Sequence, residues 1–337
     1  MLQLDYRISS AMNIKLLASL TIFGLTTLCQ ASPLNSQILQ TTSNLNVAKT
    51  LSPTNIPDPE NFLVQRKGAG KNHVVQGLAL DPQRSLLYTS HVVTAKPETV
   101  AINQFKFQNS HVWQAQSAQA PSDLIGHQGI SVEPHSGLLL ASAGSSIENR
   151  GWYIVQFSYS ANQQPSSPRI IQVFDQGYSK NTNSMPIISP DGKYLIVRSA
   201  QNKKNVIRVF KYDLLNQNNK TNISQDYQYE WTVEPSLTQD NYPFQAMTTD
   251  GEYVYFISGF GEANKPKRIF VYTIKGQLVQ KLNNISLGQQ YSSMIGQSKY
   301  WEPEGMSYNP ITKQLYILFA VGDSGKRLGL VYKINLS

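Results

Sequence analysis

The feature that most constrains the fold is a hairpin pattern that occurs five times along the chain. Each copy has a short strand that ends in a polar residue, a short turn, and a second strand of apolar and β-branched residues. The copies are QGLALDPQRSLLYTSH (76–91), QGISVEPHSGLLLASAG (128–144), MPIISPDGKYLIVRSA (185–200), QAMTTDGEYVYFISG (245–259) and EGMSYNPITKQLYILFAVG (304–322). Four copies place proline in the turn, and the other has Asp250-Gly251. Because proline presets φ and glycine accepts a positive φ, these pairs predict tight turns between strands.

The spacing of the copies predicts the size of the repeating unit. They align at Gly77, Gly129, Pro186, Ala246 and Gly305, with separations of 52, 57, 60 and 59 residues. This length suits a four-stranded sheet with long loops. A third strand follows each hairpin, at 99–107, 151–160, 205–214, 268–274 and 329–336. The sequence therefore predicts an all-β fold, a single five-bladed β-propeller with four-stranded blades.

The last copy ends after its third strand, at Ser337. We expect a strand at about 61–67 to supply its missing fourth strand, because this pairing closes the ring and leaves no sheet edge exposed there. Two separate β domains are the competing interpretation, but the repeat continues evenly across the middle of the chain.

The N-terminal residues predict export. A lysine at Lys15 precedes an apolar run at 16–28, and Cys29-Gln30-Ala31 ends in a small residue. This is the pattern of a signal peptide over 1–31, and it is too short for a membrane span. We expect a flexible N-terminal arm over 32–60, the propeller over 61–337, and a secreted or periplasmic protein. Whether the chain starts at Met1 or Met12 stays open.

The charge of the chain favours anionic partners. The formal net charge is +8, and the basic residues are scattered without a nucleic-acid recognition motif. We therefore expect a monomer that binds a cell-surface polysaccharide or an anionic wall polymer, with no nucleic acid and no transmembrane segment in the mature chain. The single cysteine excludes an intrachain disulfide.

The candidate binding residues follow from the propeller geometry. The residues that enter the innermost strands, and the loops between second and third strands, share one face of a propeller. Amides can bind sugar hydroxyls, aromatic rings can stack on a sugar, and arginine can bind phosphates or carboxylates. The candidates are Gln76, Gln128, Gln245 and Glu304 in a ring around the axis, with His91, His127, Phe260, Trp301, Glu302 and Arg327 near them. The loops add Lys96, Glu148, Arg150 and Lys203.

Three alternatives stay open for these residues. Oxygen ligands from the ring would suit a calcium ion on the axis, although we expect no cofactor. Glu302 and Glu304 would serve a glycoside hydrolase, since such enzymes use two carboxylates, although no other catalytic motif occurs. The same face would also suit a protein-protein scaffold.

The motif Trp301-Glu302-Pro303-Glu304-Gly305-Met306, with Gln76-Gly77-Leu78-Ala79 and Gly126-His127-Gln128-Gly129, resembles a known family. This family includes helveticin J-type bacteriocins, teichoic-acid biosynthesis protein C and the propeller domain of some phage receptor-binding proteins. The resemblance covers about 61–337. It implies a five-bladed propeller that recognises cell-surface polymers, with a bacteriocin-like action in some members of the family. The third copy departs from it, with Ser184-Met185-Pro186 in place of Gln-Gly.

Overall fold

The computed structural model describes most of the chain from Val74 onwards and two short N-terminal strands. The described residues are 45–46, 54–56, 74–107, 113, 115–216, 220–262, 264–285, 300–322 and 328–336. The predicted signal peptide and most of the predicted arm lie outside them. No helix within these ranges is long and apolar enough to cross a membrane.

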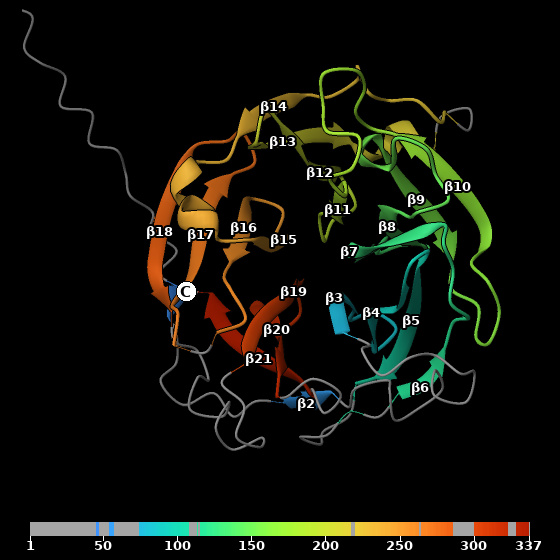
Figure 1. The fold of residues 1–337 in the computed structure, drawn as a ribbon, viewed down its shortest axis with the longest axis horizontal. Coiled ribbons are helices and arrows are strands. Elements are labelled where there is room, and N and C mark those ends of the chain that lie inside the picture. The colour runs from blue at the N-terminus through green and yellow to red at the C-terminus, as the bar shows by residue number, and fades with distance from the viewer. Residues whose placement is uncertain are drawn as a thin grey trace, which may run out of the picture. The chain divides into compact units, whose positions relative to one another are not determined.

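Within the unit Thr41–Ser337, the strands form five antiparallel sheets arranged as blades around one axis (Figure 1). Blade 1 holds β3 (Val74–Asp81), β4 (Leu86–Ala95), β5 (Glu98–Lys106) and β6 (Ala115–Ala118). Blade 2 holds β7 (Ile125–Val132), β8 (Leu139–Ala143), β9 (Tyr153–Ser158) and β10 (Ser166–Gln172). Blade 3 holds β11 (Met185–Ile188), β12 (Tyr194–Gln201), β13 (Lys204–Lys211) and β14 (Tyr229–Thr232). Blade 4 holds β15 (Phe244–Thr249), β16 (Tyr253–Ser258), β17 (Lys267–Thr273) and β18 (Leu278–Ile285). The predicted five-bladed propeller is thus confirmed.

Blade 5 is completed by the N-terminal part of the chain, as predicted, but by an earlier segment than expected. Its own strands are β19 (Trp301–Asn309), β20 (Gln314–Val321) and β21 (Leu328–Leu336). Two short strands, β1 (Leu45–Asn46) and β2 (Thr54–Ile56), pair with β21 at Leu336 and at Gly329–Val331. The closing strand is therefore split in two and lies inside the segment predicted as an arm, and residues 61–67 lie outside the described residues.

The hydrophobic core consists of layers between neighbouring blades. Each of five large buried clusters combines side chains from two adjacent blades. The cluster between blades 5 and 1 joins Leu78 and Phe105 to Leu318 and Val331, which closes the ring. Both faces of every sheet are buried in this way, and this explains the apolar second and third strands of each repeat.

The innermost strands of neighbouring blades approach so closely that the repeat requires glycine at position 305. A Cβ atom on Gly305 would lie 2.6 Å from the main-chain nitrogen of Leu78 in the neighbouring blade. Hydroxyl groups also join innermost strands of neighbouring blades: Ser307 Oγ accepts a hydrogen bond from Leu80 N (3.1 Å) between blades 5 and 1, and Ser131 Oγ accepts one from Ile188 N (3.0 Å) between blades 2 and 3. The inner ring is therefore tightly packed at the seam between blades 5 and 1.

Candidate functional site

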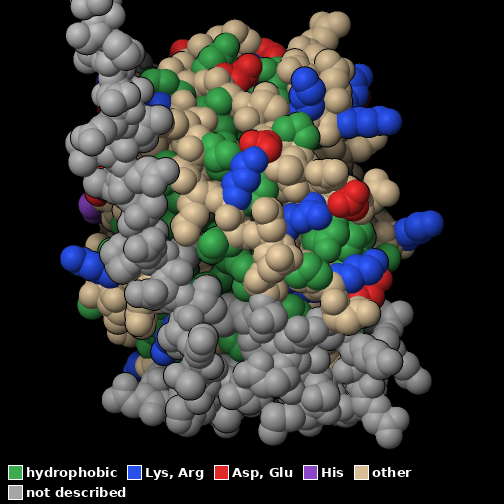
Figure 2. All heavy atoms as spheres, turned by 90° about the vertical axis from the view of Figure 1, so that its left-hand side faces the viewer, with side chains coloured by type: hydrophobic (Ala, Val, Ile, Leu, Met, Phe, Trp, Pro, Cys, Tyr) green, Lys and Arg blue, Asp and Glu red, His purple; other side chains and the backbone are tan. Residues whose placement is uncertain are grey.

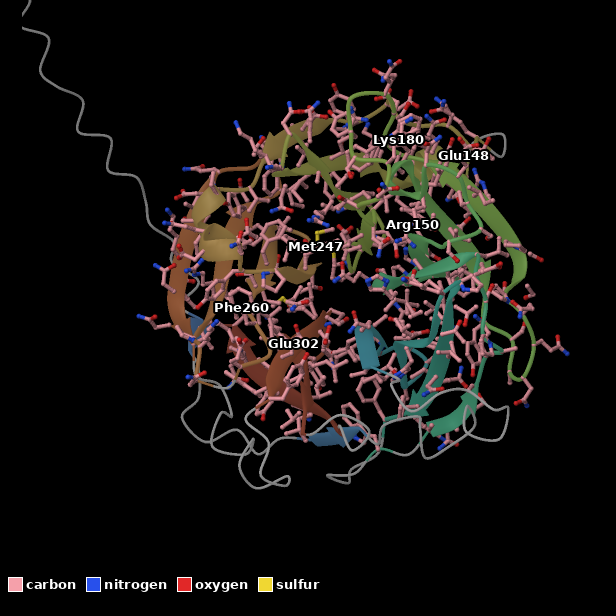
Figure 3. All side chains as sticks on the ribbon, in the orientation of Figure 1. Glu148, Arg150, Lys180, Met247, Phe260 and Glu302 are labelled. Atoms are coloured by element: carbon pink, nitrogen blue, oxygen red, sulfur yellow. The ribbon has the colours of Figure 1, made fainter. Side chains whose placement is uncertain are left out.

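The propeller has two faces that differ in chemistry. We call the face where the innermost strands begin the entry face, and it also carries the loops between second and third strands. The innermost strands end in the turns of the opposite face, the exit face, and four of these five turns contain proline. Figure 3 shows Arg150, Phe260 and Glu302, which come from the loops and strand starts of the entry face, around the channel mouth.

Three of the four predicted ring residues lie at β-bulges. The pairing register shifts between Val75 and Gly77, between Phe244 and Ala246, and between Pro303 and Gly305, so no strand partner faces the residue in between. These residues are Gln76, Gln245 and Glu304. In blade 2 a longer irregularity, from Ile125 to Ile130, includes Gln128. A bulge turns a side chain away from the normal alternation, and this is how the repeat aims one polar side chain per blade.

The ring residues make a narrow channel rather than an open pocket. Gln245 and Glu304 are buried and line a cavity of about 10 Å³, roughly the space of one water molecule. Gln245 Nε2 donates hydrogen bonds to Glu302 Oε1 (2.9 Å) and to the carbonyl oxygen of Gly259 (3.0 Å). Blade 3 breaks the ring, because the apolar side chain of Met185 occupies the equivalent position and lines the same cavity.

Two further predicted candidates, Trp301 and His91, are buried away from the channel mouth. Trp301 is 0% exposed, and its ring stacks on Phe319 with centroids 4.5 Å apart. Its role as a stacking surface for sugar is therefore corrected, since no face of the ring reaches solvent. His91 is also buried, and its Nε2 lies 2.7 Å from Thr89 Oγ1. Arg327 lies outside the described residues.

An ionic cluster on the entry face joins blades 1 and 2. Glu98, at the start of β5, lies between His127 Nδ1 (2.8 Å) and Arg150 Nη1 (3.1 Å). Burial raises the pKa of Glu98, but the hydrogen bonds and charges of His127 and Arg150 outweigh it and hold the pKa below its usual value. Asn183 Nδ2 lies 3.4 Å from His127 Nδ1, which brings blade 3 to the same cluster. Sequence reasoning singled out His127 and Arg150 but not Glu98.

A groove of about 450 Å³ opens beside this cluster. Its lining combines cationic, carboxylate, amide, hydroxyl and apolar groups from Lys96, Glu98, Ser145, Ile147, Asn149, Arg150 and Asn181. Ser145 Oγ donates a hydrogen bond to the carbonyl oxygen of Glu98 (2.7 Å), and the 3₁₀ helix η3 (Arg150–Trp152) carries Arg150 into the groove. Arg150 lies nearer the channel mouth than Glu148 does (Figure 3). We call this site the blade 1–2 groove. It offers one ligand the ammonium group of Lys96, the guanidinium group of Arg150, which is paired with Glu98, and several hydrogen-bonding groups.

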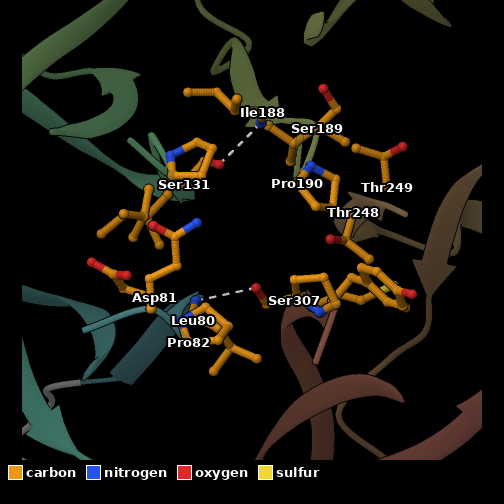
Figure 4. A pocket seen from close by; sticks show the side chains of 18 residues that line it. Leu80, Asp81, Pro82, Ser131, Ile188, Ser189, Pro190, Thr248, Thr249 and Ser307 are labelled. Atoms are coloured by element: carbon orange, nitrogen blue, oxygen red, sulfur yellow. Dashed lines mark hydrogen bonds between the residues drawn. The ribbon is translucent and has the colours of Figure 1, made fainter. Parts of the chain in front are cut away.

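The exit face has a smaller pocket that sequence reasoning did not propose. It has a volume of about 60 Å³ and is lined by the turn prolines Pro82, Pro134, Pro190 and Pro310 with apolar and hydroxyl side chains (Figure 4). Its only charged side chain, Asp81, is paired with Arg84 at 3.0 Å. The pocket suits a few water molecules or a small neutral group, in contrast to the blade 1–2 groove.

The side of the ring that Figure 2 shows has a mixed surface. In Figure 2, basic side chains are scattered among acidic, polar and hydrophobic ones on the side of the ring that lies at the left in Figure 1. Within the described ranges, no three His, Cys, Asp or Glu side chains lie close enough to hold a metal ion. The axial calcium ion stays a prediction, as do the monomeric state and the absence of nucleic-acid binding.

Comparisons with known proteins agree with this architecture. The model of a phage 5-bladed β-propeller receptor-binding platform domain matches residues 74–333. The tail fiber of Staphylococcus aureus phage P68 aligns with a TM-score of 0.56 and 20% identity, covering 79% of this chain and 50% of that structure. The chain thus spans about half the length of that tail fiber. A thermostable family-43 glycoside hydrolase aligns with a TM-score of 0.44 and 10% identity over 79% of this chain and 90% of the other.

No curated protein matches the chain. The likeness to the tail fiber shows the propeller fold, and the family model goes further because it matches most of the chain. The phage part of the predicted resemblance is confirmed, whereas the helveticin J part stays a prediction. The chain belongs to the family of phage five-bladed β-propeller receptor-binding platform domains.

Proposed function

We propose that the protein is an exported, non-catalytic binder of anionic cell-surface polymers, and that the polymer occupies the blade 1–2 groove. The observation that carries the proposal is the lining of this groove, where Lys96 and Arg150 stand beside the amides of Asn149 and Asn181. Guanidinium and ammonium groups bind phosphates and carboxylates, and amides bind sugar hydroxyls. Membership of a receptor-binding family supports a binding role toward a cell-surface receptor.

The geometry favours this function over the two alternatives. Glu304 is buried and lines a cavity with room for about one water molecule, so its carboxylate is not open to a sugar ring, and Glu302 accepts a hydrogen bond from Gln245. A protein-protein scaffold would need a broad apolar patch. Within the described residues, the exposed large hydrophobic side chains are Ile170 and Ile311 alone.

Export and location are part of the same proposal. The predicted signal peptide over 1–31 supports a secreted or periplasmic protein, and a receptor-binding family is consistent with work outside the cell. Binding of a surface polymer is sufficient to explain the groove lining, and no catalytic step is needed. A bacteriocin-like action would add killing to recognition, and growth inhibition by the purified protein would reveal it.

The test is an array of wall teichoic acids, lipopolysaccharides and neutral polysaccharides, probed with the purified protein and its variants. Lys96→Gln and Arg150→Gln each remove one positive charge from the groove, and Lys193→Gln removes an exposed one from the exit face as a matched control. We expect saturable binding to an anionic polymer that falls about tenfold or more in Arg150→Gln, since hydrogen bonds to charged groups contribute about 1.5–3 kcal/mol. Binding unchanged in both groove variants, or to neutral polymers alone, would contradict the proposal.

A further inference from the structure

We propose that the entry face carries a second subsite, an aromatic platform formed by Tyr242 and Phe260, which stacks on a sugar ring of the bound polymer. The inference rests on the proposed function and narrows the ligand class. A ligand that uses both subsites is a polysaccharide that carries anionic groups and is long enough to reach across the channel mouth.

The platform faces the same side as the groove. Phe260 lies in the loop that joins β16 to β17, and Arg150 lies in the equivalent loop between β8 and β9. Loops of this kind share one face of a propeller. Figure 3 shows Phe260 and Arg150 on opposite sides of the channel, in blades 4 and 2. One ligand can therefore touch both subsites only by extending over the channel mouth.

The two rings are held in a fixed arrangement. Tyr242 and Phe260 are half-buried and meet edge to face, with centroids 4.8 Å apart and planes at 66°. The guanidinium carbon of Arg268 lies 3.8 Å from the centroid of Tyr242. Arg268 Nη1 in turn donates hydrogen bonds to the carbonyl oxygens of Ser236 (3.0 Å) and Gln239 (2.8 Å), which fixes the chain before Tyr242. A rigid aromatic surface binds with little loss of side-chain entropy.

Buried groups support the loop of Phe260 from below. Trp301 N donates a hydrogen bond to the carbonyl oxygen of Gly261 (2.6 Å). The ammonium group of Lys267 binds the carbonyl oxygens of Phe260 and Glu262, the latter at 3.0 Å, and lies 4.8 Å from the centroid of Trp301. Trp301, which we expected to stack on the ligand, is thus a positioning residue for the aromatic side chain that can do so.

A cation beside the platform supplies the anionic preference. Lys265 Nζ lies 4.5 Å from the centroid of Phe260 and 3.3 Å from Glu262 Oε1. Both side chains are about half exposed, and such surface ion pairs contribute little. Lys265 Nζ lies over the Phe260 ring, so Lys265 has to leave both the ring and Glu262 for a sugar to stack on that face, and its ammonium group can then bind the carboxylate of the stacked sugar. Phosphate or carboxylate chains without sugar rings would gain nothing from the aromatic surface.

Two subsites on one rigid ring predict recognition that depends on polymer length. The first contact makes the second intramolecular, so affinity rises once the polymer spans both subsites. Probes for this behaviour are length-fractionated oligogalacturonates, which carry one carboxylate per sugar ring, and linear polyphosphates of similar charge. The variants are Phe260→Ala, the conservative Phe260→Trp, Arg150→Gln, and the exit-face control Lys193→Gln, each checked for folding by thermal unfolding.

We expect Phe260→Ala to lower affinity for long oligogalacturonates about tenfold, to remove most of the gain with length, and to leave polyphosphate binding unchanged. Phe260→Trp should retain binding, and Arg150→Gln should weaken both probes. Unchanged oligogalacturonate affinity in a folded Phe260→Ala variant, with Arg150→Gln still weakened, would overturn the platform and leave the groove standing. Failure of the wild-type protein to bind either probe would overturn the proposed function together with the platform.

Discussion

The ammonium group of Lys267 lies 4.8 Å from the centroid of the Trp301 ring, and both side chains are fully buried between blades 4 and 5. A buried lysine is costly unless its charge is compensated. Here the compensation comes from two loop carbonyl oxygens and the ring face, so the pair fixes the loop that carries Phe260.

This burial predicts a pH-dependent stability. Burial lowers the pKa of Lys267 to about 8, against the opposing effects of Glu302 and Glu262. In the unfolded chain the group keeps its proton up to about pH 10.4. Between these two pKa values the unfolded state binds more protons than the folded state. The free energy of unfolding therefore increases with pH, by at most about 1.4 kcal/mol per pH unit.

Denaturant titrations of the wild type and Lys267→Met between pH 7 and 10 measure this gain. As the pH rises above 8, the free energy of unfolding of the wild type should increase relative to that of Lys267→Met. Lys265→Met changes an exposed lysine nearby, and its free energy of unfolding should follow the same pH dependence as that of the wild type. Parallel curves for Lys267→Met as well would show that Lys267 is not a buried cation.

The seam between blades 5 and 1 predicts a second effect. Gly305→Ala would place a Cβ atom 2.6 Å from Leu78 N, and a main-chain atom cannot move aside easily. We expect a loss of about 1–3 kcal/mol in unfolding free energy, as for other overpacked sites. Ile311→Ala, at a side chain that is 70% exposed, should change stability by less than about 0.5 kcal/mol. Equal stability of the two variants would mean that the inner ring is looser than the structure shows.

The ionic cluster of the groove predicts a third effect, at acidic pH. The pKa of Glu98 lies below its usual value, so its contribution is present above the unfolded pKa and is lost as the pH falls through the folded one. The stability difference between the wild type and Glu98→Gln should shrink as the pH falls below about 4.5. Urea titrations at four or five pH values test this, and a difference that persists to the lowest pH would argue against the pairing with His127 and Arg150.

Much of the fold could be predicted because its signals are local. Proline or glycine in each turn and apolar strands on either side recur at every blade, and the five sheets follow them closely. The closing strand was harder to locate. It is split between Leu45–Asn46 and Thr54–Ile56, and such short pieces have no alternation that separates them from a polar linker.

The site could be predicted in part, for a physical reason. Strand alternation assigns Glu302 and Glu304 to one face, but the bulge at Glu304 breaks the alternation. Residues before and after the bulge therefore do not share one alternation, and the sequence motif around Trp301 does not reveal that the Trp301 ring packs between blades 4 and 5. Glu98 escaped notice because its partners His127 and Arg150 are 29 and 52 residues away in the chain. Arg150 and Phe260 can be assigned to equivalent loops from the sequence because the repeat fixes which loops share a face.

The central claim is that the charges of the blade 1–2 groove recognise an anionic polymer. The most direct measurement is the salt dependence of the dissociation constant for the polymer selected on the array, compared between the wild type and the double variant Lys96→Gln/Arg150→Gln. We predict that wild-type affinity falls steeply between 50 and 300 mM salt, whereas the double variant binds weakly with a clearly shallower dependence, because these charges supply the attraction that salt screens. The same steep dependence in both proteins would contradict the account, since the attraction would then come from charges elsewhere on the ring.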